Sequence, residues 1–373
     1  MFDAFEPLSL GPLTARNRLV RSATWLGLAS PGGAVTDALV ERYRELGAGG
    51  VGTVITGYAA VSPGGRQMPR MLGIHDDELV PGLTRIAAAI QAGGALAGIQ
   101  LVHAGGQTQA SWLPGGTPVA PSFLEHPQFP EVPRQLTLEE IVKIVADFGQ
   151  AARRAREAGF DFLQLHGAHG YLINQFLSPG TNHRTDRYGG GLRMRFRFLQ
   201  EVLASVQGAV GPEYPVAIKL NGADYVDGGL DAADAEQVAE WLGMRGLCFI
   251  EVSGGTPGSG AEGPARTQIT SGENEAYFRE SAAAIKRRVP CPVALVGGLR
   301  SLETVERLLM DNGADLLSLA RPLLWEPDLP SRWQAGDRSP AKCISCNRCF
   351  GPGVKGEGVR CVVRDAEQGE GAG

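Results

Sequence analysis

Short, almost continuously apolar runs alternate along the chain with longer amphipathic stretches. The runs LCFIEVS (247–253) and DLLSLA (315–320) hardly alternate between polar and apolar residues, which is typical of strands buried on both faces of a parallel sheet. The stretches between such runs repeat apolar residues every three to four positions, as amphipathic helices do. Eight strand-then-helix units can be counted. They predict a (β/α)8 barrel, a fold of about 250 residues plus insertions, rather than a doubly wound open sheet.

Cap and turn residues separate the units. Thr36 precedes an apolar-periodic stretch as a helix N-cap, and Thr137 with Glu140 forms a capping box before another. Residues 104–135 are rich in glycine and proline, and so long a loop predicts a functional or mobile segment. The predicted strands span residues 17–23, 51–61, 95–103, 160–165, 215–222, 247–255, 291–298 and 314–322. The helices are expected within residues 36–50, 77–94, 137–159, 194–210, 231–246, 274–289 and 301–313.

The composition is that of an ordinary globular protein. Of 373 residues, 43% are hydrophobic and 20% are charged, and the net charge of −5 implies no general attraction to nucleic acid. The N-terminus lacks a charged region followed by an apolar one, so we expect no signal peptide. No apolar run reaches the ~20 residues that span a membrane. We therefore expect a cytoplasmic protein without a membrane partner, and a homo-oligomer is compatible with the sequence.

Four of the six cysteines lie near the C-terminus in the pattern C-x2-C-x2-C-x11-C. In a reducing compartment such a cluster indicates metal or redox chemistry before disulfides. Zinc, a [4Fe–4S] cluster and free thiols remain open. Residues 1–335 are the predicted barrel and 336–373 a Cys-rich extension, which we expect to be disordered after Arg364, where charge and glycine prevail. The candidate metal ligands are Cys343, Cys346, Cys349 and Cys361.

Titratable residues follow the fourth predicted strand, at the end where a parallel barrel keeps its chemistry. His166 and His169 are three positions apart, and Tyr171 comes two positions later. One interpretation is a zinc site, which needs a third ligand, and Asp224 and His183 are available. The other, which we favour, is a pair of donors aimed at one carbonyl oxygen, with Tyr171 placed to give a proton.

Residues at other strand ends indicate a flat, anionic ligand. Gly297 and Gly298 follow the seventh strand and Arg321 follows the eighth, where barrels commonly bind phosphate. Lys219 lies inside an apolar strand and needs an anionic partner, which either a flavin or a structural ion pair would supply. Gln100, late in the third strand, would bond the polar edge of a heterocycle or satisfy backbone groups.

The stretch HGAHGYLINQFLSPGTNHRTDRYGG (166–190), together with GIQLVHAG, NRLVRSAT and LLSLARPLL, resembles the old yellow enzyme family of FMN-dependent NADH:flavin oxidoreductases. The match runs from about Pro7 to Trp333. The resemblance implies a (β/α)8 barrel with FMN at its C-terminal mouth. In that family NADH or NADPH gives a hydride to the flavin, which passes it to the β-carbon of an electron-poor alkene.

Carried over by position, the resemblance implies that His166 and His169 bond the carbonyl oxygen of a small unsaturated substrate, and that Tyr171 protonates its α-carbon. The residues implied to hold or line the flavin ring are Gln100, Lys219, Ala23, Thr24 and Ala60. Those implied to bind its phosphate are Gly297, Gly298, Ala320 and Arg321. The family's flavin-tuning position falls on Trp25 by counting, although Thr24 carries the suitable hydroxyl.

The cysteine pattern is similar to the iron–sulfur stretch of 2,4-dienoyl-CoA reductases, which have one residue more between the second and third cysteines. Those relatives carry a histidine after the sixth strand, which residues 253–264 lack. They also continue into a second flavin and nucleotide domain, which we do not expect in a chain that ends at Gly373. We therefore predict an ene-reductase that uses FMN and NAD(P)H. An iron–sulfur flavoprotein reductase and a zinc-dependent barrel hydrolase are the alternatives.

Overall fold

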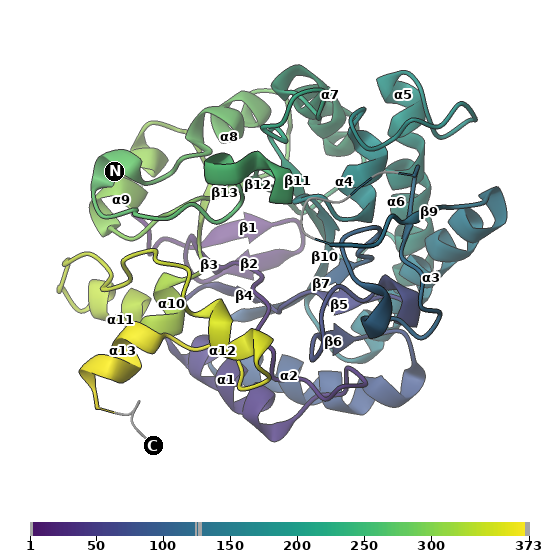
Figure 1. The fold of residues 1–373 in the computed structure, drawn as a ribbon. Helices are drawn as coiled ribbons and strands as arrows, with labels where there is room; N and C mark the ends of the chain where they lie inside the picture. Colours follow the sequence, from purple (N-terminus) through teal and green to yellow (C-terminus); the bar gives the residue numbers. More distant parts are fainter. Residues whose placement is uncertain (1–2, 124, 126–128, 370–373) are drawn as a thin grey trace.

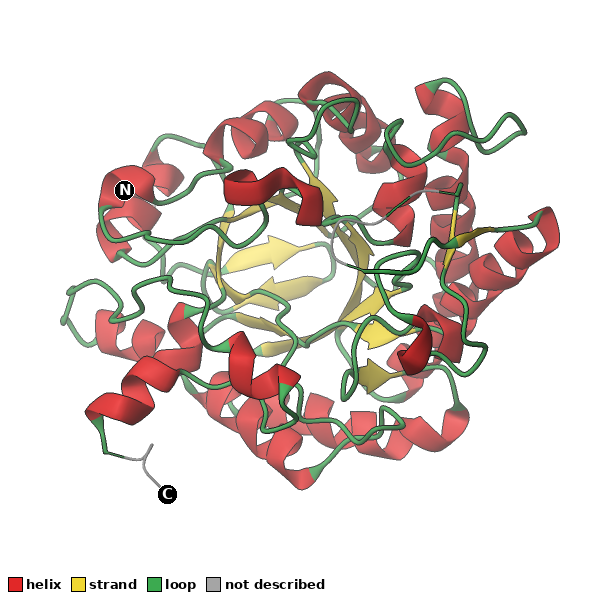
Figure 2. Cartoon of the chain, viewed as in Figure 1, coloured by secondary structure: helices red, strands yellow, loops and turns green. Residues whose placement is uncertain are grey.

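A closed ring of parallel strands forms the centre of the computed structural model, which describes residues 3–123, 125 and 129–369 (Figure 1). Each strand pairs with the next, and the pairing of β10 with β7 closes the ring. The ring order is β10 (Phe162–Gly167), β11 (Val216–Asn221), β12 (Phe249–Ser253), β13 (Val293–Val296), β14 (Leu316–Leu319), β3 (Leu19–Arg21), β4 (Thr53–Ile55) and β7 (Leu96–Val102). Figure 2 shows these strands inside a circle of helices. The predicted (β/α)8 barrel is confirmed.

Both predicted helix starts are confirmed. The Thr36 hydroxyl accepts the N–H of Leu39 at 3.3 Å, and Thr137 and Glu140 make the two reciprocal bonds of a capping box. The helices are α1 (Asp37–Ala48), α2 (Val80–Ala92), α3 (Leu138–Glu157), α4 (Leu172–Leu177), α5 (Leu192–Arg195), α6 (Arg197–Val210), α7 (Ala232–Gly243), α8 (Arg279–Lys286), α9 (Leu302–Met310), α10 (Pro322–Trp325) and α11 (Leu329–Gln334). Within the described residues, none is long and apolar enough to cross a membrane.

An N-terminal hairpin, absent from the predicted elements, closes the barrel end opposite the mouth. Its strands are β1 (Leu8–Leu10) and β2 (Leu13–Ala15), which pair antiparallel. Leu10 and Ala15 are fully buried in one apolar cluster with Phe162 and Phe249, the first residues of two barrel strands. Strands of three residues are too short to show periodicity, so this element has no sequence signal of its own.

Two other predictions need correction. The strand expected over 51–61 is two strands, β4 and β5 (Ala59–Ala60), with a break at Gly57. A Cβ on Gly57 would lie 2.6 Å from the carbonyl oxygen of Thr24, so these two backbones approach too closely for any other residue. The loop over 104–135 also contains paired strands, β8 (Val119–Ala120) and β9 (Arg134–Gln135), and short β6 (Leu72–Gly73) pairs with β5.

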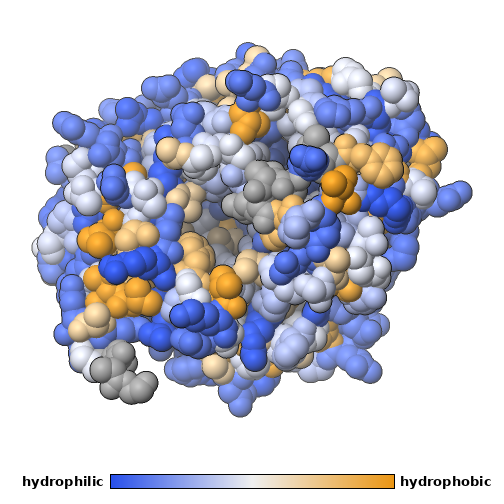
Figure 3. All heavy atoms as spheres, in the orientation of Figure 1, coloured by the Kyte–Doolittle hydropathy of each residue, from blue (hydrophilic) through white to orange (hydrophobic). Residues whose placement is uncertain are grey.

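The C-terminal segment, yellow in Figure 1, lies along one side of the barrel mouth. It carries α12 (Phe350–Val354) and α13 (Val362–Glu367). Gly353 packs against the indole of Trp25, where a Cβ would lie 2.9 Å from the ring. Disorder directly after Arg364 was the wrong expectation, because α13 continues past this residue to Glu367, and residues 370–373 lie outside the described part. Figure 3 shows the centre of this face hollowed.

Candidate active site

A cavity of about 600 Å³ opens between the strand ends and the C-terminal segment, with Phe350 and Val354 of α12 in its wall. The residues of the sequence prediction that line it are Ala23, Thr24, Trp25, His166, His169, Tyr171, Lys219, Gly298, Ala320 and Arg321. Those outside its lining are Ala60, Gln100 and Gly297. The barrel thus brings residues from five strand ends (β3, β10, β11, β13 and β14) to one space, as the topology requires.

The two histidines and Tyr171 converge on this cavity. His166 lies in β10, and its ring centroid is 5.1 Å from that of His169 and 4.6 Å from that of Tyr171. Both ring pairs are edge-on, at 80° and 71°. Because the edges of imidazole carry its donors and acceptors, this arrangement leaves polar ring atoms available to one ligand in the cavity.

His169 is held in an unusual backbone conformation. Its φ is +62°, in the left-handed region that non-glycine residues rarely adopt. Its N–H donates to Asn221 Oδ1 at 3.1 Å, and its Nε2 lies 2.7 Å from Ser253 Oγ. Both partners are the last residues of their strands, β11 and β12. Three neighbouring strands therefore fix the imidazole, and such strain is often concentrated at functional sites.

Burial sets the protonation states. It lowers the pKa of both His166 and His169 well below 6.5. The charge of Lys219 adds to both shifts, and His169 adds to that of His166. It raises the pKa of Tyr171 to about 12. At neutral pH the imidazoles are therefore uncharged and the phenol keeps its proton. His166 Nδ1 accepts the N–H of Ala168 at 3.4 Å, which leaves Nε2 as the protonated nitrogen.

The sequence reasoning missed a second phenol beside this group. Tyr58, between β4 and β5, lines the cavity, and its ring lies 5.6 Å from Tyr171 and 6.2 Å from His166. Its hydroxyl donates to Gln67 Oε1 at 2.9 Å. Burial raises the pKa of Tyr58 well above 10, so it too stays protonated. The sequence placed Tyr58 inside a predicted strand, and nothing in that pattern indicated that its side chain faces the cavity.

The sequence left open whether a flavin or a structural ion pair balances the charge of Lys219, and the structure shows an ion pair. Its Nζ lies 3.3 Å from Glu251 Oε2 in the neighbouring strand and 2.8 Å from Ser22 Oγ. Burial raises the pKa of Glu251, but the charge of Lys219 and several hydrogen bonds outweigh it, so the net shift is downward. Gln100 joins this network through Gln164, at 2.6 Å, instead of lining the cavity. Lys219 also lines the cavity, so its ammonium group can contact both Glu251 and a ligand in the cavity.

The cavity fits FMN, a flat ring with a phosphate-bearing chain. Its volume lies in the range of cofactor sites, and Lys219 and Arg321 give it positive charge. Gly298 has a φ of +72°, and a Cβ there would lie 2.7 Å from the ring of Tyr277, so only bare backbone fits beside the cavity. Arg321 Nη1 is fixed by the carbonyl oxygen of Arg266 at 2.8 Å and by Asn347 Oδ1 at 2.6 Å.

A second, much smaller cavity of about 20 Å³ is lined by all four C-terminal cysteines and by Arg321. Burial raises the pKa of Cys349 to about 11 and also raises that of Cys343. The thiols have the donor chemistry of a metal or iron–sulfur site. Within the described residues, however, no three His, Cys, Asp or Glu side chains stand together as metal ligands. The same holds for the histidine pair, which has no third His, Cys, Asp or Glu beside it among the described residues.

Comparison with known proteins agrees with this geometry. Residues 3–339 match the model of the NADH:flavin oxidoreductase / NADH oxidase family. A 4,4'-dithiodibutanoate disulfide reductase of Rhodococcus erythropolis is 35% identical over 97% of this chain and 95% of its own. An old yellow enzyme homologue from Zymomonas mobilis superimposes with a TM-score of 0.79 at 27% identity, covering 92% of this chain and 96% of its own.

A metal reductase of Desulforamulus reducens is 36% identical over 98% of this chain, which spans only 54% of that protein. The chain thus corresponds to about half of some relatives and to nearly the whole of others. The resemblance that the histidine stretch carried is confirmed, and the chain belongs to the NADH:flavin oxidoreductase / NADH oxidase family.

Proposed function

We propose that the protein binds FMN in the 600 Å³ cavity and reduces activated C=C bonds of small α,β-unsaturated carbonyl compounds with electrons from NADH or NADPH. The observation that carries this proposal is the convergence of two uncharged imidazoles and one protonated phenol on that cavity. Family membership supports flavin and nicotinamide chemistry. The side chains that would hold the cofactor are Thr24, Lys219 and Arg321, with the backbone at Gly298.

The chain's own residues would polarise the substrate and supply a proton. Nε2–H of His166 and the ring of His169 donate to the carbonyl oxygen, where negative charge grows as the alkene accepts hydride. Each such donor contributes about 3 kcal/mol when it is fixed in place beforehand, as the hydrogen bond between His169 Nε2 and Ser253 Oγ fixes His169. Tyr171 holds a proton at neutral pH and gives it to the α-carbon. Bound FMN supplies the hydride-transfer chemistry.

Replacing Tyr171 with Phe tests the proposal, because only one half-reaction needs its proton. Flavin reduction by the nicotinamide should stay within about twofold, while reoxidation by an enone should slow at least about 100-fold, the usual contribution of a positioned acid. Stopped-flow absorbance of the flavin measures both steps. Tyr188→Phe is the matched control, since Tyr188 is fully buried but bonds Glu201 away from the cavity. Equal slowing of both half-reactions in Tyr171→Phe would contradict the proposal.

A second candidate is an iron–sulfur flavoprotein reductase. The observation that favours it is that four thiols line one cavity and share Arg321 with the larger one. We infer that the C-terminal cysteines bind zinc or a [4Fe–4S] cluster. Iron, sulfide and zinc analysis of purified protein, with its visible spectrum, decides between them: broad brown absorption beside the flavin bands supports a cluster. A protein free of all three elements after anaerobic purification would leave four free thiols and remove this candidate.

A further inference from the structure

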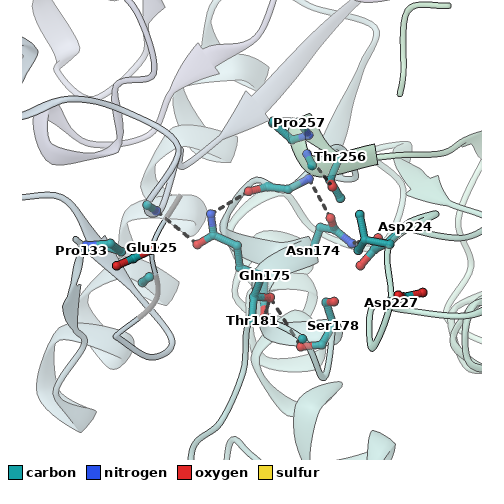
Figure 4. Close-up of a pocket in the computed structure, with 16 residues that line it drawn as sticks. Glu125, Pro133, Asn174, Gln175, Ser178, Thr181, Asp224, Asp227, Thr256 and Pro257 are labelled. Atoms are coloured by element: carbon teal, nitrogen blue, oxygen red, sulfur yellow. Dashed lines mark hydrogen bonds between the residues drawn. The ribbon is translucent and has the colours of Figure 1, made fainter. Parts of the chain in front are cut away.

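A separate pocket of about 200 Å³ lies beside the loop after β10, the loop that carries His169 and Tyr171. Gly170 lines it, whereas the two neighbours of Gly170 in the chain, His169 and Tyr171, line the main cavity. Pro257 lines both spaces. The two cavities are therefore adjacent at the loop after β10 and at Pro257, which Figure 4 shows in the lining of the smaller pocket.

The floor of the pocket is rigid. Asn174 and Gln175, consecutive residues of α4, hold both backbone groups of Gly170: Asn174 Oδ1 accepts its N–H at 2.7 Å, and Gln175 Nε2 donates to its carbonyl oxygen at 2.6 Å. Asn174 also donates to Asp224 Oδ1 at 3.0 Å. Figure 4 shows these bonds in a row beneath the pocket. A preformed floor of this kind lowers the entropic cost of binding a ligand.

One hydroxyl of the lining has no partner. The side chain of Ser178 is only 3% exposed, and its Oγ makes no hydrogen bond to any described residue. Because Ser178 lines the pocket, a ligand there can bond this hydroxyl.

The charge of the lining is one-sided. Asp224, Asp227 and Glu125 line the pocket. Asp224 is buried and already accepts hydrogen bonds from the side chains of Asn174 and Asn221 and from the N–H of Leu230, so the exposed Asp227 and Glu125 carry the charge that a ligand would meet. Among its described lining residues there is no Lys, Arg or His. Val226 and Pro133 add apolar wall. Carboxylates and a free hydroxyl beside apolar surface complement an alkylammonium group and repel an anion.

We propose that this pocket is a second subsite of the active site, which takes a protonated amine at the far end of the unsaturated carbonyl substrate. The proposal rests on the proposed function, since it places the reacting alkene beside the histidines. The connecting chain of the substrate passes Pro257, which faces both cavities. The same charges disfavour an acyl-CoA, whose phosphates would meet Asp227 and Glu125.

A matched substrate series tests the subsite. Enones with an alkyl arm ending in ammonium, methyl or carboxylate are compared with the armless enone by kcat/KM at low salt. In the wild-type protein we expect the ammonium arm to exceed the methyl arm about tenfold and the carboxylate arm to fall below it. Asp227→Asn and Ser178→Ala should each reduce the ammonium preference, and Asp227→Lys should reverse it in favour of carboxylate. Within each variant, values are divided by that for the armless enone.

Glu213→Gln is the control, because it removes the same charge from an exposed residue that does not line the pocket. It should keep the wild-type preference. An ammonium preference that is absent from the wild type, or unchanged by both Asp227→Asn and Ser178→Ala, overturns the subsite. A wild-type protein that reduces no armless enone overturns the proposed function instead, so the two failures are distinguishable. Titration with phenols carrying the same arms gives the preference as Kd, without turnover.

Discussion

The loop after β10 and the segment after β14 both lie over the barrel mouth, but they are positioned in different ways. His166 is the next-to-last residue of β10, whose neighbours on both sides belong to the ring, and the last residues of β11 and β12 bond His169. The cysteine segment has no strand among its described residues, and contacts such as those of the Asn347 side chain with Arg321 and the carbonyl oxygen of Ala265 attach it. The histidines are positioned by the sheet and therefore by the fold itself, whereas the position of the cysteines depends on the few bonds that attach their segment to the barrel.

The largest effect is expected where the barrel carries buried charge. Lys219→Met leaves Glu251 without its cation inside the ring, and both side chains are almost fully buried. Breaking such a pair costs about 3–5 kcal/mol of unfolding free energy, measured by urea denaturation. The double variant Lys219→Met with Glu251→Gln should regain most of the loss, because no charge is then left unpaired. A loss below about 1 kcal/mol in Lys219→Met would show that the sheet does not depend on this pair.

The affinity for phenols tests whether His166 and His169 bind the ligand oxygen. Phenols carry an oxygen like that of the substrate, and His166→Ala with His169→Ala removes both donors to it. Two hydrogen bonds to a charged oxygen are each worth about 1.5–3 kcal/mol, so Kd should rise at least about 100-fold in a flavin absorbance titration. His183→Ala, an exposed histidine outside the cavity, should leave Kd unchanged. Unchanged affinity in the double variant would remove the oxygen-binding role.

The same contrast explains what could be predicted from the sequence. The apolar runs gave the barrel, and the rule that chemistry sits at strand ends brought His166, His169 and Tyr171 into one group. Both features are local, so one sequence suffices. Tyr58 and Phe350 reach the cavity through a strand break and a docked helix, which periodicity does not encode. Glu251 was visible inside its strand, yet its pairing with Lys219 depends on strand register, which the topology sets.

Acid should weaken the strand-end region first. Burial lowers the pKa of His103 to about 3, and its Nδ1 accepts the N–H of Gly105 at 3.1 Å. Because this folded-state pKa lies below the unfolded value near 6.5, protons favour the unfolded state, and stability is lost as pH falls below about 6.5. The slope for one such histidine approaches 1.4 kcal/mol per pH unit. His103→Gln should make urea-derived stability less steep between pH 6.5 and 5, while exposed His183→Gln should not.

The smallest effect is expected in the docked segment. Asn347→Ala removes its bonds to Arg321 and to the carbonyl oxygen of Ala265, both at 2.6 Å. A combined net loss of about 1.4 kcal/mol for the two bonds favours opening of the segment by roughly tenfold. Cys343 and Cys361, each 9% exposed, should therefore react with a thiol reagent about tenfold faster, as measured by mass spectrometry. If barrel unfolding weakened as much as thiol protection, the segment would be part of the cooperative fold, and the contrast between the two regions would not hold.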